Sequence, residues 1–516
     1  MSPPGRPKGE YRSAQREGTP LSPPGRPKGE YRSAQREGTP VWRGAHALVL
    51  VLLAGTAVAA TPRPVGRAFL DADVPLNAVA LVVQDVTKPR PLFTHQPDRP
   101  YNPASVMKLV TTFAALELLG PDYRWKTFAY LDGPLDAGVL NGNLVLKGSG
   151  DPKITIERWQ AFMAALREKG LAAVEGDLVL DRSYFAPVPH DASAFDGEPQ
   201  KPYNVGPDAL LVNFKAVKFG FAPDATADAT VATVEPSLPT VAVGAPPKPG
   251  GGDCGDWRAT LGAAFTDHGT RAEAFFAGRY PASCGEREWW VALLNHPTYV
   301  HGMFDTYFRA AGGRFAGRWK DGTAPAGVFP FATMESAPLW DIVRDINKNS
   351  NNVMARQLFL TLATARAPPP ATTARATETV LAWLAQRKLR MPELVLDNGS
   401  GLSRRERISA GSLARLLVAA DGSAVREEFA SSLAVAAMDG TVQRRFRNGS
   451  VAGQALLKTG TLDGVRALAG YVIDNQGRRF VVVALVNHAN AARAQGALDY
   501  LVQWVYQYGA SWAPPR

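Results

Sequence analysis

The chain carries its most informative segment at Asn102-Pro103-Ala104-Ser105-Val106-Met107-Lys108, where a proline and a serine precede an apolar run. Proline favours the first turn of a helix, because its missing N–H would have no partner there in any case. Apolar side chains then recur at helical spacing, and Gly120-Pro121 ends the pattern. We therefore expect a helix that begins near Pro103 and holds Ser105 in its first turn. Its apolar positions are Val106, Leu109, Val110, Phe113, Leu116 and Leu119.

Ser105 and Lys108 lie one helical turn apart, so the amine of the lysine can reach the serine hydroxyl. Free backbone N–H groups and the positive end of the helix dipole favour a developing negative charge at this position. A serine beside an amine base is one way to build a nucleophile without histidine. The Ser-x-x-Lys pattern alone arises by chance about once in a chain of this length. Taken singly, the segment is explained more simply as a capped amphipathic helix.

Net charge is concentrated at the N-terminus. The 516 residues carry a net charge of +10, but the first 60 residues hold nine Lys/Arg and four Asp/Glu, which leaves 48 against 43 for the rest. This mild excess does not have the form of a nucleic-acid-binding surface, although it is compatible with an anionic polymer as partner. With 46% apolar residues, the chain is long enough for two or three domains with their own cores.

The first 60 residues are expected to lie outside the folded protein. Residues 2–20 and 22–40 are identical and rich in proline, glycine and charge, which predicts disorder. We interpret residues 1–40 as a duplicated tail upstream of the true start, with a functional basic tail as the alternative. Residues 41–60 have the pattern of a signal peptide, with Arg43, an apolar run over 47–54 and small residues up to Ala60. This predicts export to the periplasm and leaves a loose association with the membrane open.

The two cysteines, Cys254 and Cys284, lie thirty residues apart in segments that resemble loops. In an oxidising compartment we expect them to form one disulfide, with two free thiols as the alternative. They are too few and too distant for a zinc site, and the seven histidines show no metal-ligand spacing. We expect no metal and no cofactor.

Strand patterns occur at both ends of the chain, and helical patterns lie between them. The predicted strands cover 78–86, 91–95, 454–460, 467–473 and 480–488, and a final helix covers 491–508. This order predicts an α+β fold with one antiparallel sheet built from both chain ends. Residues 61–130 and 295–516 would form this domain, 131–190 an inserted α+β domain, and 191–294 a nested β-rich insert that contains the cysteines.

Three short motifs follow one another along the chain, namely Ser105-Val106-Met107-Lys108, Ser350-Asn351-Asn352 and Lys458-Thr459-Gly460. The first opens a predicted helix, the second lies between two predicted helices, and the third ends a predicted strand. Chance explains each motif singly but not all three in this order and context. Class A β-lactamases and penicillin-binding proteins carry such a set, and this sequence resembles that group of serine acyl-enzymes.

The long segment between Ser105 and Ser350 departs from the compact β-lactamases. The chain is similar to the penicillin-binding protein 4 type of D-alanyl-D-alanine carboxypeptidase/endopeptidase over about residues 65–510. Further stretches that carry this resemblance are Gly150-Asp151-Pro152, Asp181-Arg182-Ser183-Tyr184-Phe185, residues 397–404 and Asp439-Gly440-Thr441. The resemblance implies a β-lactamase/transpeptidase-like domain, an antiparallel sheet flanked by helices, with two nested inserted domains.

The same resemblance implies roles for individual residues. Ser105 would attack the peptide carbonyl, and Lys108 would take its proton, which is easier if nearby Lys458 lowers the pKa of Lys108. Ser350 would relay a proton to the leaving amine, and Asn352 would hold Lys108 and the substrate amide. Lys458, Thr459 and Thr461 would bind the terminal carboxylate, and Gly460 would belong to the same substrate-binding strand. The N–H groups of Ser105 and Thr461 would form the oxyanion hole, and Arg404 would add a substrate contact. Taken singly, helix capping explains Ser350 and Asn352, and a solvated strand end explains the Lys-Thr-Gly motif.

Together, the motifs predict a periplasmic serine DD-peptidase that acts on peptidoglycan stem peptides through an acyl-Ser105 intermediate. It would remove the terminal D-Ala, cleave D-Ala–diaminopimelate cross-links, or do both, and β-lactams would be covalent inhibitors. A β-lactamase and a catalytically silent wall-binding protein are the alternatives. The sequence leaves open the balance between the two peptidase activities and whether the chain forms a homo-oligomer. Asp196 and Glu198 could read a substrate amine, but we interpret them as part of a solvated loop.

Overall fold

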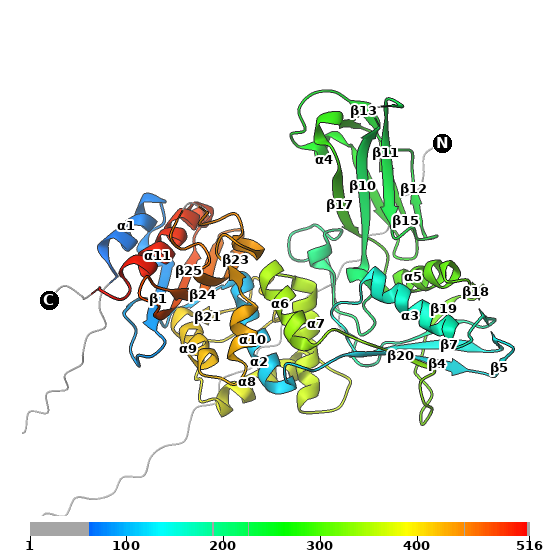
Figure 1. The fold of residues 1–516 in the computed structure, drawn as a ribbon, viewed down its shortest axis with the longest axis horizontal. Coiled ribbons are helices and arrows are strands. Elements are labelled where there is room, and N and C mark those ends of the chain that lie inside the picture. The colour runs from blue at the N-terminus through cyan, green and yellow to red at the C-terminus, as the bar shows by residue number, and fades with distance from the viewer. Residues whose placement is uncertain (1–60, 188–189, 225, 448, 513–516) are drawn as a thin grey trace, which may run out of the picture. The chain divides into compact units, whose positions relative to one another are not determined.

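The computed structural model describes residues 61–187, 190–224, 226–447 and 449–512 (Figure 1). The repeated segment 1–40 and the predicted signal peptide 41–60 lie outside these ranges. No helix within the described ranges is long and apolar enough to cross a membrane.

A six-stranded antiparallel sheet joins segments from both ends of the described chain, in the order β2-β1-β25-β24-β23-β22. The strands are β1 (Val79–Asp85), β2 (Phe93–His95), β22 (Ala434–Val435), β23 (Ala455–Leu462), β24 (Val465–Ile473) and β25 (Arg479–Asn487). Strand β1 pairs along its whole length with β25, from Val79 opposite Val486 to Asp85 opposite Phe480. This pairing confirms the expected sheet built from both chain ends.

Helices cover both faces of this sheet, which is why all seven residues of β1 are buried. Successive side chains of a strand point to opposite faces. Ala80 and Val82 accordingly join one core, whereas Leu81 and Val83 join another. The helices of the first core are α2 (Lys108–Leu119), α6 (Leu339–Asn349), α7 (Asn352–Leu362), α8 (Thr373–Gln386), α9 (Ala410–Asp421) and α10 (Arg426–Ser431).

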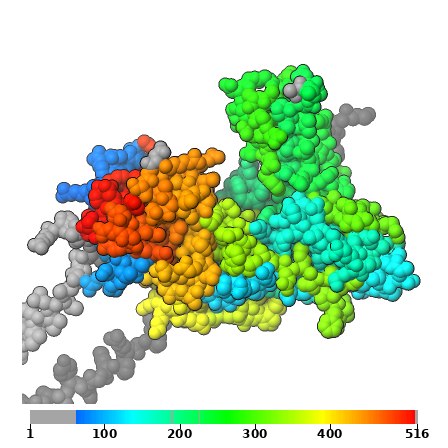
Figure 2. Space-filling view, in the orientation of Figure 1, coloured from blue at the N-terminus to red at the C-terminus, as the bar shows by residue number. Residues whose placement is uncertain are grey.

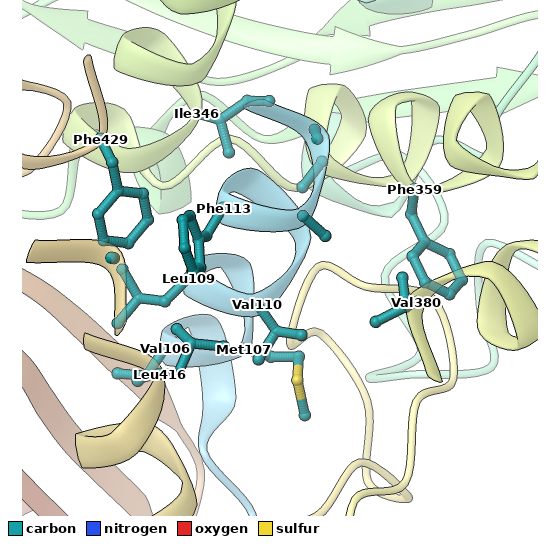
Figure 3. Packing of buried hydrophobic residues seen from close by; sticks show 14 of the residues in the cluster. Val106, Met107, Leu109, Val110, Phe113, Ile346, Phe359, Val380, Leu416 and Phe429 are labelled. Atoms are coloured by element: carbon teal, nitrogen blue, oxygen red, sulfur yellow. The ribbon is translucent and has the colours of Figure 1, made fainter. Parts of the chain in front are cut away.

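Helix α2 is the centre of the first core (Figure 3). Every residue from Lys108 to Leu116 is buried, so the helix is enclosed on all sides rather than on one amphipathic face. The ring of Phe113 lies 5.2 Å from that of Trp383 and 5.3 Å from that of Phe429, measured between ring centroids. This packing fixes the position of α2 within the core.

The second core lies under α1 (Arg63–Asp71) and α11 (Gln495–Tyr508), which contact each other. Helix α11 confirms the predicted final helix, although its first residues form a separate 3₁₀ segment, Ala489–Ala494. The sequence analysis did not predict α1. This helix has nine residues and buries only Val65, Gly66 and Phe69, too few positions for a periodic pattern.

Residues between α2 and α6 form further sheets, one in the order β19-β9-β7-β4-β20 and one in the order β18-β8-β6-β5. Helices α3 (Ile156–Glu168) and α5 (His296–Ala310) pack with them around Trp159 and Phe304. The strands are β4 (Lys126–Asp132), β5 (Leu135–Asp136), β6 (Val139–Leu140), β7 (Asn143–Gly148), β8 (Ala173–Val174), β9 (Leu178–Asp181), β18 (Arg314–Phe315), β19 (Trp319–Asp321) and β20 (Ala332–Glu335).

The expected boundary at residue 295 does not follow these pairings. Strands β18, β19 and β20 pair with β8, β9 and β4, so the segment that we assigned to the catalytic domain contributes to the sheets of the insert. Cyan and green atoms of these two segments lie side by side in Figure 2. The reason is that the chain, after the nested insert, adds further strands to the sheets that its earlier segment had begun. Strand β4 begins at Lys126, so the sheet of the insert also starts before the expected boundary at residue 130. The boundary at residue 190 stays a prediction.

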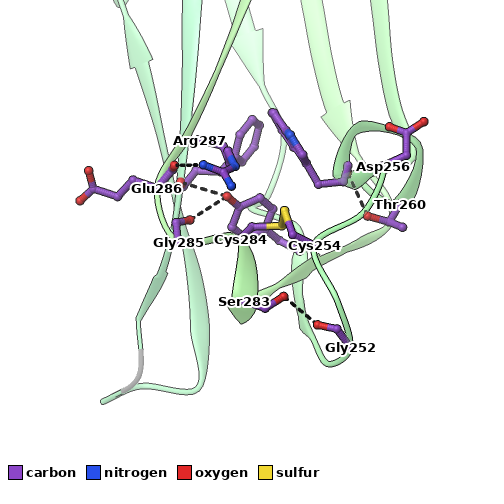
Figure 4. Close-up of a disulfide and its surroundings, with 12 residues drawn as sticks. Gly252, Cys254, Asp256, Thr260, Ser283, Cys284, Gly285, Glu286 and Arg287 are labelled. Atoms are coloured by element: carbon purple, nitrogen blue, oxygen red, sulfur yellow. Dashed lines mark hydrogen bonds between the residues drawn. A yellow bond between two sulfur atoms is a disulfide. The ribbon is translucent and has the colours of Figure 1, made fainter. Parts of the chain in front are cut away.

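The nested segment forms three small sheets. One contains β10 (Ala216–Asp224), β11 (Ala229–Glu235) and β17 (Arg287–Ala292), one contains β12 (Val241–Val243), β14 (Ala263–Asp267) and β15 (Ala272–Phe276), and one contains β13 (Lys248–Gly250) and β16 (Arg279–Pro281). Cys254 and Cys284 form a disulfide here, as expected (Figure 4). Beside it, the Ser283 hydroxyl donates a hydrogen bond to the Gly252 carbonyl oxygen at 2.7 Å.

Candidate active site

Ser105 lies in a 3₁₀ turn, Ala104–Met107, that leads directly into α2. This confirms that the serine begins the predicted helix, with a tighter first turn than an α-helix. Two glycines allow other segments to approach the turn. A Cβ atom on Gly460 of β23 would lie 2.6 Å from the Pro103 carbonyl oxygen, and one on Gly401 would lie 2.0 Å from the Ala104 carbonyl oxygen. Ser105 is therefore held between a sheet strand and a turn.

Lys108 is fully buried beneath this serine. Its Nζ lies 3.0 Å from Ser105 Oγ and 2.6 Å from Asn352 Oδ1, and it also donates a hydrogen bond to the Ser400 carbonyl oxygen. Burial is the largest cause that lowers the pKa of Lys108 well below its usual value, and the positive charge of Lys458 adds to it. A neutral amine has two N–H donors and one lone pair. The contacts with Asn352 and Ser400 therefore hold Nζ within hydrogen-bond distance of the Ser105 hydroxyl.

The Ser-Asn-Asn motif forms the junction between α6 and α7. Ser350 ends α6 in a left-handed conformation, with φ 57° and ψ 35°. Asn351 supplies the cap, since its Oδ1 accepts a hydrogen bond from the Met354 N–H at 3.0 Å. The side chains of Ser350 and Asn352 instead face the two buried lysines. Capping therefore accounts for the middle residue of the motif and for neither of its neighbours.

Lys458 is the second fully buried lysine. Its Nζ donates hydrogen bonds to Ser350 Oγ at 2.8 Å and to the Thr459 carbonyl oxygen at 2.9 Å. Burial lowers the pKa of Lys458 to about 7. The hydroxyl of Thr459 bonds that of Thr441 at 2.8 Å, and Thr461 on the same strand is exposed.

Arg404 lies beside this strand, exposed to solvent. Its guanidinium donates a hydrogen bond to the Asp463 carbonyl oxygen at 2.9 Å and lies 5.0 Å from the centre of the Phe195 ring. Arg404 thus connects the turn after β23 to the nested insert.

Asp196, the neighbour of Phe195, accepts hydrogen bonds from Tyr203 Oη at 2.7 Å and Asn204 Nδ2 at 2.8 Å. Its carboxylate is engaged within its own loop.

A cavity of about 470 Å³ adjoins Arg404, lined by residues of the 190–207 loop, of α7 and of residues 397–405. Within the described ranges, no three His, Cys, Asp or Glu side chains come together as metal ligands would.

Three groups near the lysines were not expected from the sequence, namely the Ser400 carbonyl, the buried Arg356 and the buried Glu406. Glu406 lies in the run Arg404-Arg405-Glu406-Arg407, whose composition indicates a solvated loop.

A serine at a helix start, a buried lysine one turn later and a Lys-Thr-Gly strand beside them, on a sheet covered by helices, define the group of serine acyl-enzymes that includes β-lactamases and penicillin-binding proteins. Residues 64–508 match the D-Ala-D-Ala carboxypeptidase 3 (S13) family. The chain belongs to this family, as the resemblance of its motifs implied.

Individual relatives are distant but similar over most of their length. D-alanyl-D-alanine carboxypeptidase DacB of Haemophilus influenzae is 23% identical over 394 residues, which cover 74% of this chain and 80% of that protein. The D-alanyl-D-alanine carboxypeptidase of Actinomadura sp. (strain R39) is 28% identical over 464 residues, 84% of this chain and 82% of that protein. The crystal structure of penicillin-binding protein 4 (dacB) from Haemophilus influenzae matches with a TM-score of 0.72 at 21% identity, over 86% of this chain and 99% of that one. A complex of that protein with a novel β-lactam matches with a TM-score of 0.68, 21% identity and the same coverage.

Proposed function

We propose that this protein is an exported DD-peptidase that hydrolyses the bond after a D-Ala residue in peptidoglycan stem peptides, with Ser105 as its nucleophile. The observation that carries the proposal is the 3.0 Å distance between Lys108 Nζ and Ser105 Oγ, with the lysine fully buried and its pKa lowered. A base must be within hydrogen-bond reach of the proton that it abstracts and unprotonated when it does so.

In the proposed first step, Lys108 takes the proton of the Ser105 hydroxyl while Oγ attacks the carbonyl carbon. The N–H groups of Ser105 and Thr461 stabilise the oxyanion. The carbon–nitrogen bond then breaks, and the leaving amine takes the proton from Lys108 through the Ser350 hydroxyl, which lies 2.8 Å from Lys458 Nζ. Lys108, neutral again, takes a proton from a water molecule that attacks the acyl carbonyl carbon, and when the ester bond breaks this proton returns to Ser105 Oγ. Asn352 keeps Lys108 oriented throughout.

The substrate carboxylate is assigned to Lys458, Thr459, Gly460 and Thr461, which line one strand beside the serine. Protonated Lys458 supplies the positive charge, and the threonine hydroxyls supply neutral donors. Arg404 adds a contact on the exposed side. Family membership supports stem peptides as substrates and β-lactams as covalent inhibitors. Cleavage of D-Ala–diaminopimelate cross-links and location in the periplasm complete the proposal.

The deciding experiment is intact-protein mass spectrometry after exposure to benzylpenicillin, with the modified peptide sequenced. We expect one adduct on Ser105 in the wild-type chain and none in Ser105→Ala, whose fold should be unchanged because a half-buried hydroxyl adds little to the core. Release of D-Ala from a soluble stem pentapeptide should be lost in the same variant. An adduct on another serine, such as Ser350 or Ser400, would overturn the assignment.

A further inference from the structure

Glu406 is a fully buried carboxyl group next to the turn that approaches Ser105. Its Oε1 accepts hydrogen bonds from three consecutive backbone N–H groups, those of Asp397 at 3.2 Å, Asn398 at 3.1 Å and Gly399 at 2.9 Å. Its Oε2 has no hydrogen-bond partner. An oxygen that accepts three N–H groups favours the ionised carboxylate, whereas burial opposes ionisation and raises the pKa of Glu406.

The carbonyl groups of the same turn are bound on the side of α2. The Gly399 carbonyl oxygen accepts a hydrogen bond from the Thr111 hydroxyl at 2.7 Å, and the next carbonyl, that of Ser400, accepts one from Lys108 Nζ. Gly401 then contacts the backbone of Ala104. The turn is therefore held on two sides. Residues of α2 bind the carbonyl groups of the turn, and Glu406 binds its backbone N–H groups.

Charge adds a second link between Glu406 and the lysine. Lys458 on β23, Arg356 on α7 and Glu406 act electrostatically on Lys108, and Glu406 is the acid among these three groups. Asp397, in the same turn, acts on Glu406 and pairs with Arg405. A buried anion next to buried cations raises their affinity for protons.

We propose that Glu406 is a positioning residue of this active site, which holds the Ser400 carbonyl against Lys108 through the turn 397–401 and, as a carboxylate, adds a negative charge to the surroundings of this lysine. The inference rests on the proposed function, since it gives Lys108 the part of the base. Glu406 does not touch the substrate. It acts through the turn 397–401 and through Lys108, so that both the place of the amine and its basicity depend on one carboxylate.

Two substitutions separate the two effects. Glu406→Gln retains an oxygen that can accept the three N–H groups but removes the charge, and Glu406→Ala removes both. Glu393→Gln is the matched control, because Glu393 also accepts a backbone N–H, that of Ser409 at 3.1 Å, but it binds Ser409 and Ser412 rather than the turn 397–401. Each protein is acylated with a fluorescent penicillin between about pH 5 and pH 9, the range in which a perturbed base titrates.

For Glu406→Gln we expect the acidic limb of the rate profile to shift to lower pH, because loss of the anion lowers the pKa of Lys108. Glu406→Ala should lose roughly ten- to hundredfold in rate at every pH, the effect of a misplaced base. Hydrogen exchange in the peptide that contains residues 397–401 should accelerate in Glu406→Ala but not in Glu406→Gln. Glu393→Gln should show the wild-type profile.

A Glu406→Gln profile that superimposes on the wild type would overturn the electrostatic part of the inference. A wild-type rate and wild-type exchange in Glu406→Ala would overturn the positioning part. If the wild-type chain itself is not acylated, the proposed function fails, whereas the hydrogen-exchange comparison still tests whether Glu406 fastens the turn.

Discussion

The Nζ atom of Lys108 lies 2.6 Å from Oδ1 of Asn352, although 244 residues separate them in the chain. The two residues belong to α2 and α7, which pack directly against each other in the buried core. Their contact brings the first two sequence motifs together. It also makes the orientation of the amine depend on the packing of two helices.

Asn352→Ala should slow acylation by penicillin by roughly one to two orders of magnitude, because the Lys108 amine loses the acceptor that orients it. The neighbouring Asn351→Ala is the control. It removes the helix cap and should lower the free energy of unfolding by about 1 kcal/mol without changing the acylation rate. Stopped-flow acylation and urea denaturation measure the two effects. Equal acylation rates in the two variants would contradict the assignment.

The pKa of Lys458, lowered by burial to about 7 from its usual 10.5, makes stability depend on pH. Between these values the unfolded chain binds more protons than the folded one, so the free energy of unfolding should rise as the pH rises. Lys458→Met removes this penalty. Its stability relative to the wild type should therefore be greater at pH 7 than at pH 10, by about 2 kcal/mol or more. Urea denaturation at both pH values measures this difference, and a constant difference would refute it.

The same titration should affect substrate binding. Only protonated Lys458 offers a positive charge to a terminal carboxylate. We expect KM for a stem peptide with a free carboxylate to increase as the pH rises above about 7. A matched peptide with an amidated C-terminus is the control, and its KM should change less. Steady-state D-Ala release at several pH values distinguishes the two, and parallel curves would count against Lys458 as the carboxylate ligand.

Gly460→Ala should displace the Ser105 turn, because its Cβ would lie 2.6 Å from the Pro103 carbonyl oxygen. We expect a loss of stability of about 1–3 kcal/mol, as for other overpacked sites, and an acylation rate reduced roughly a hundredfold. Gly496→Ala in α11 is the control, since nothing lies within 4 Å of its Cβ, and it should leave acylation unchanged. Wild-type acylation by Gly460→Ala would show that the turn does not need this close contact.

Replacement of both Cys254 and Cys284 by serine should lower the stability of the nested insert by about 2–4 kcal/mol, since the disulfide closes a long loop. The acylation rate should be unchanged, because Cys284 belongs to the core of the insert, whereas α2 belongs to a different core. Limited proteolysis reports on the insert, and penicillin labelling reports on the site. Loss of labelling would imply that the insert supports the active site directly.

Local patterns in the sequence were sufficient for much of the architecture. Periodic apolar residues predicted α2 and the meander β23-β24-β25, and the strand patterns at both ends predicted their common sheet. Two features could not be predicted from local patterns. The domain boundary near residue 295 depends on which distant strands pair, and helix α1 is too short to show a periodic pattern.

Ser105, Lys108, Ser350, Asn352 and Lys458 were identified as candidates because their motifs are short and contiguous, and spacing within a motif is a local property of the chain. The protonation of Lys108 and Lys458, in contrast, does not depend on the local sequence. Burial lowers the pKa of both lysines, and burial arises only when helices and strands far apart in sequence enclose them. Glu406 shows the same limit, since a glutamate among arginines has the composition of a surface loop. Its burial depends on the folded chain, in which the turn 397–401 binds its carboxylate on one side and α2 on the other.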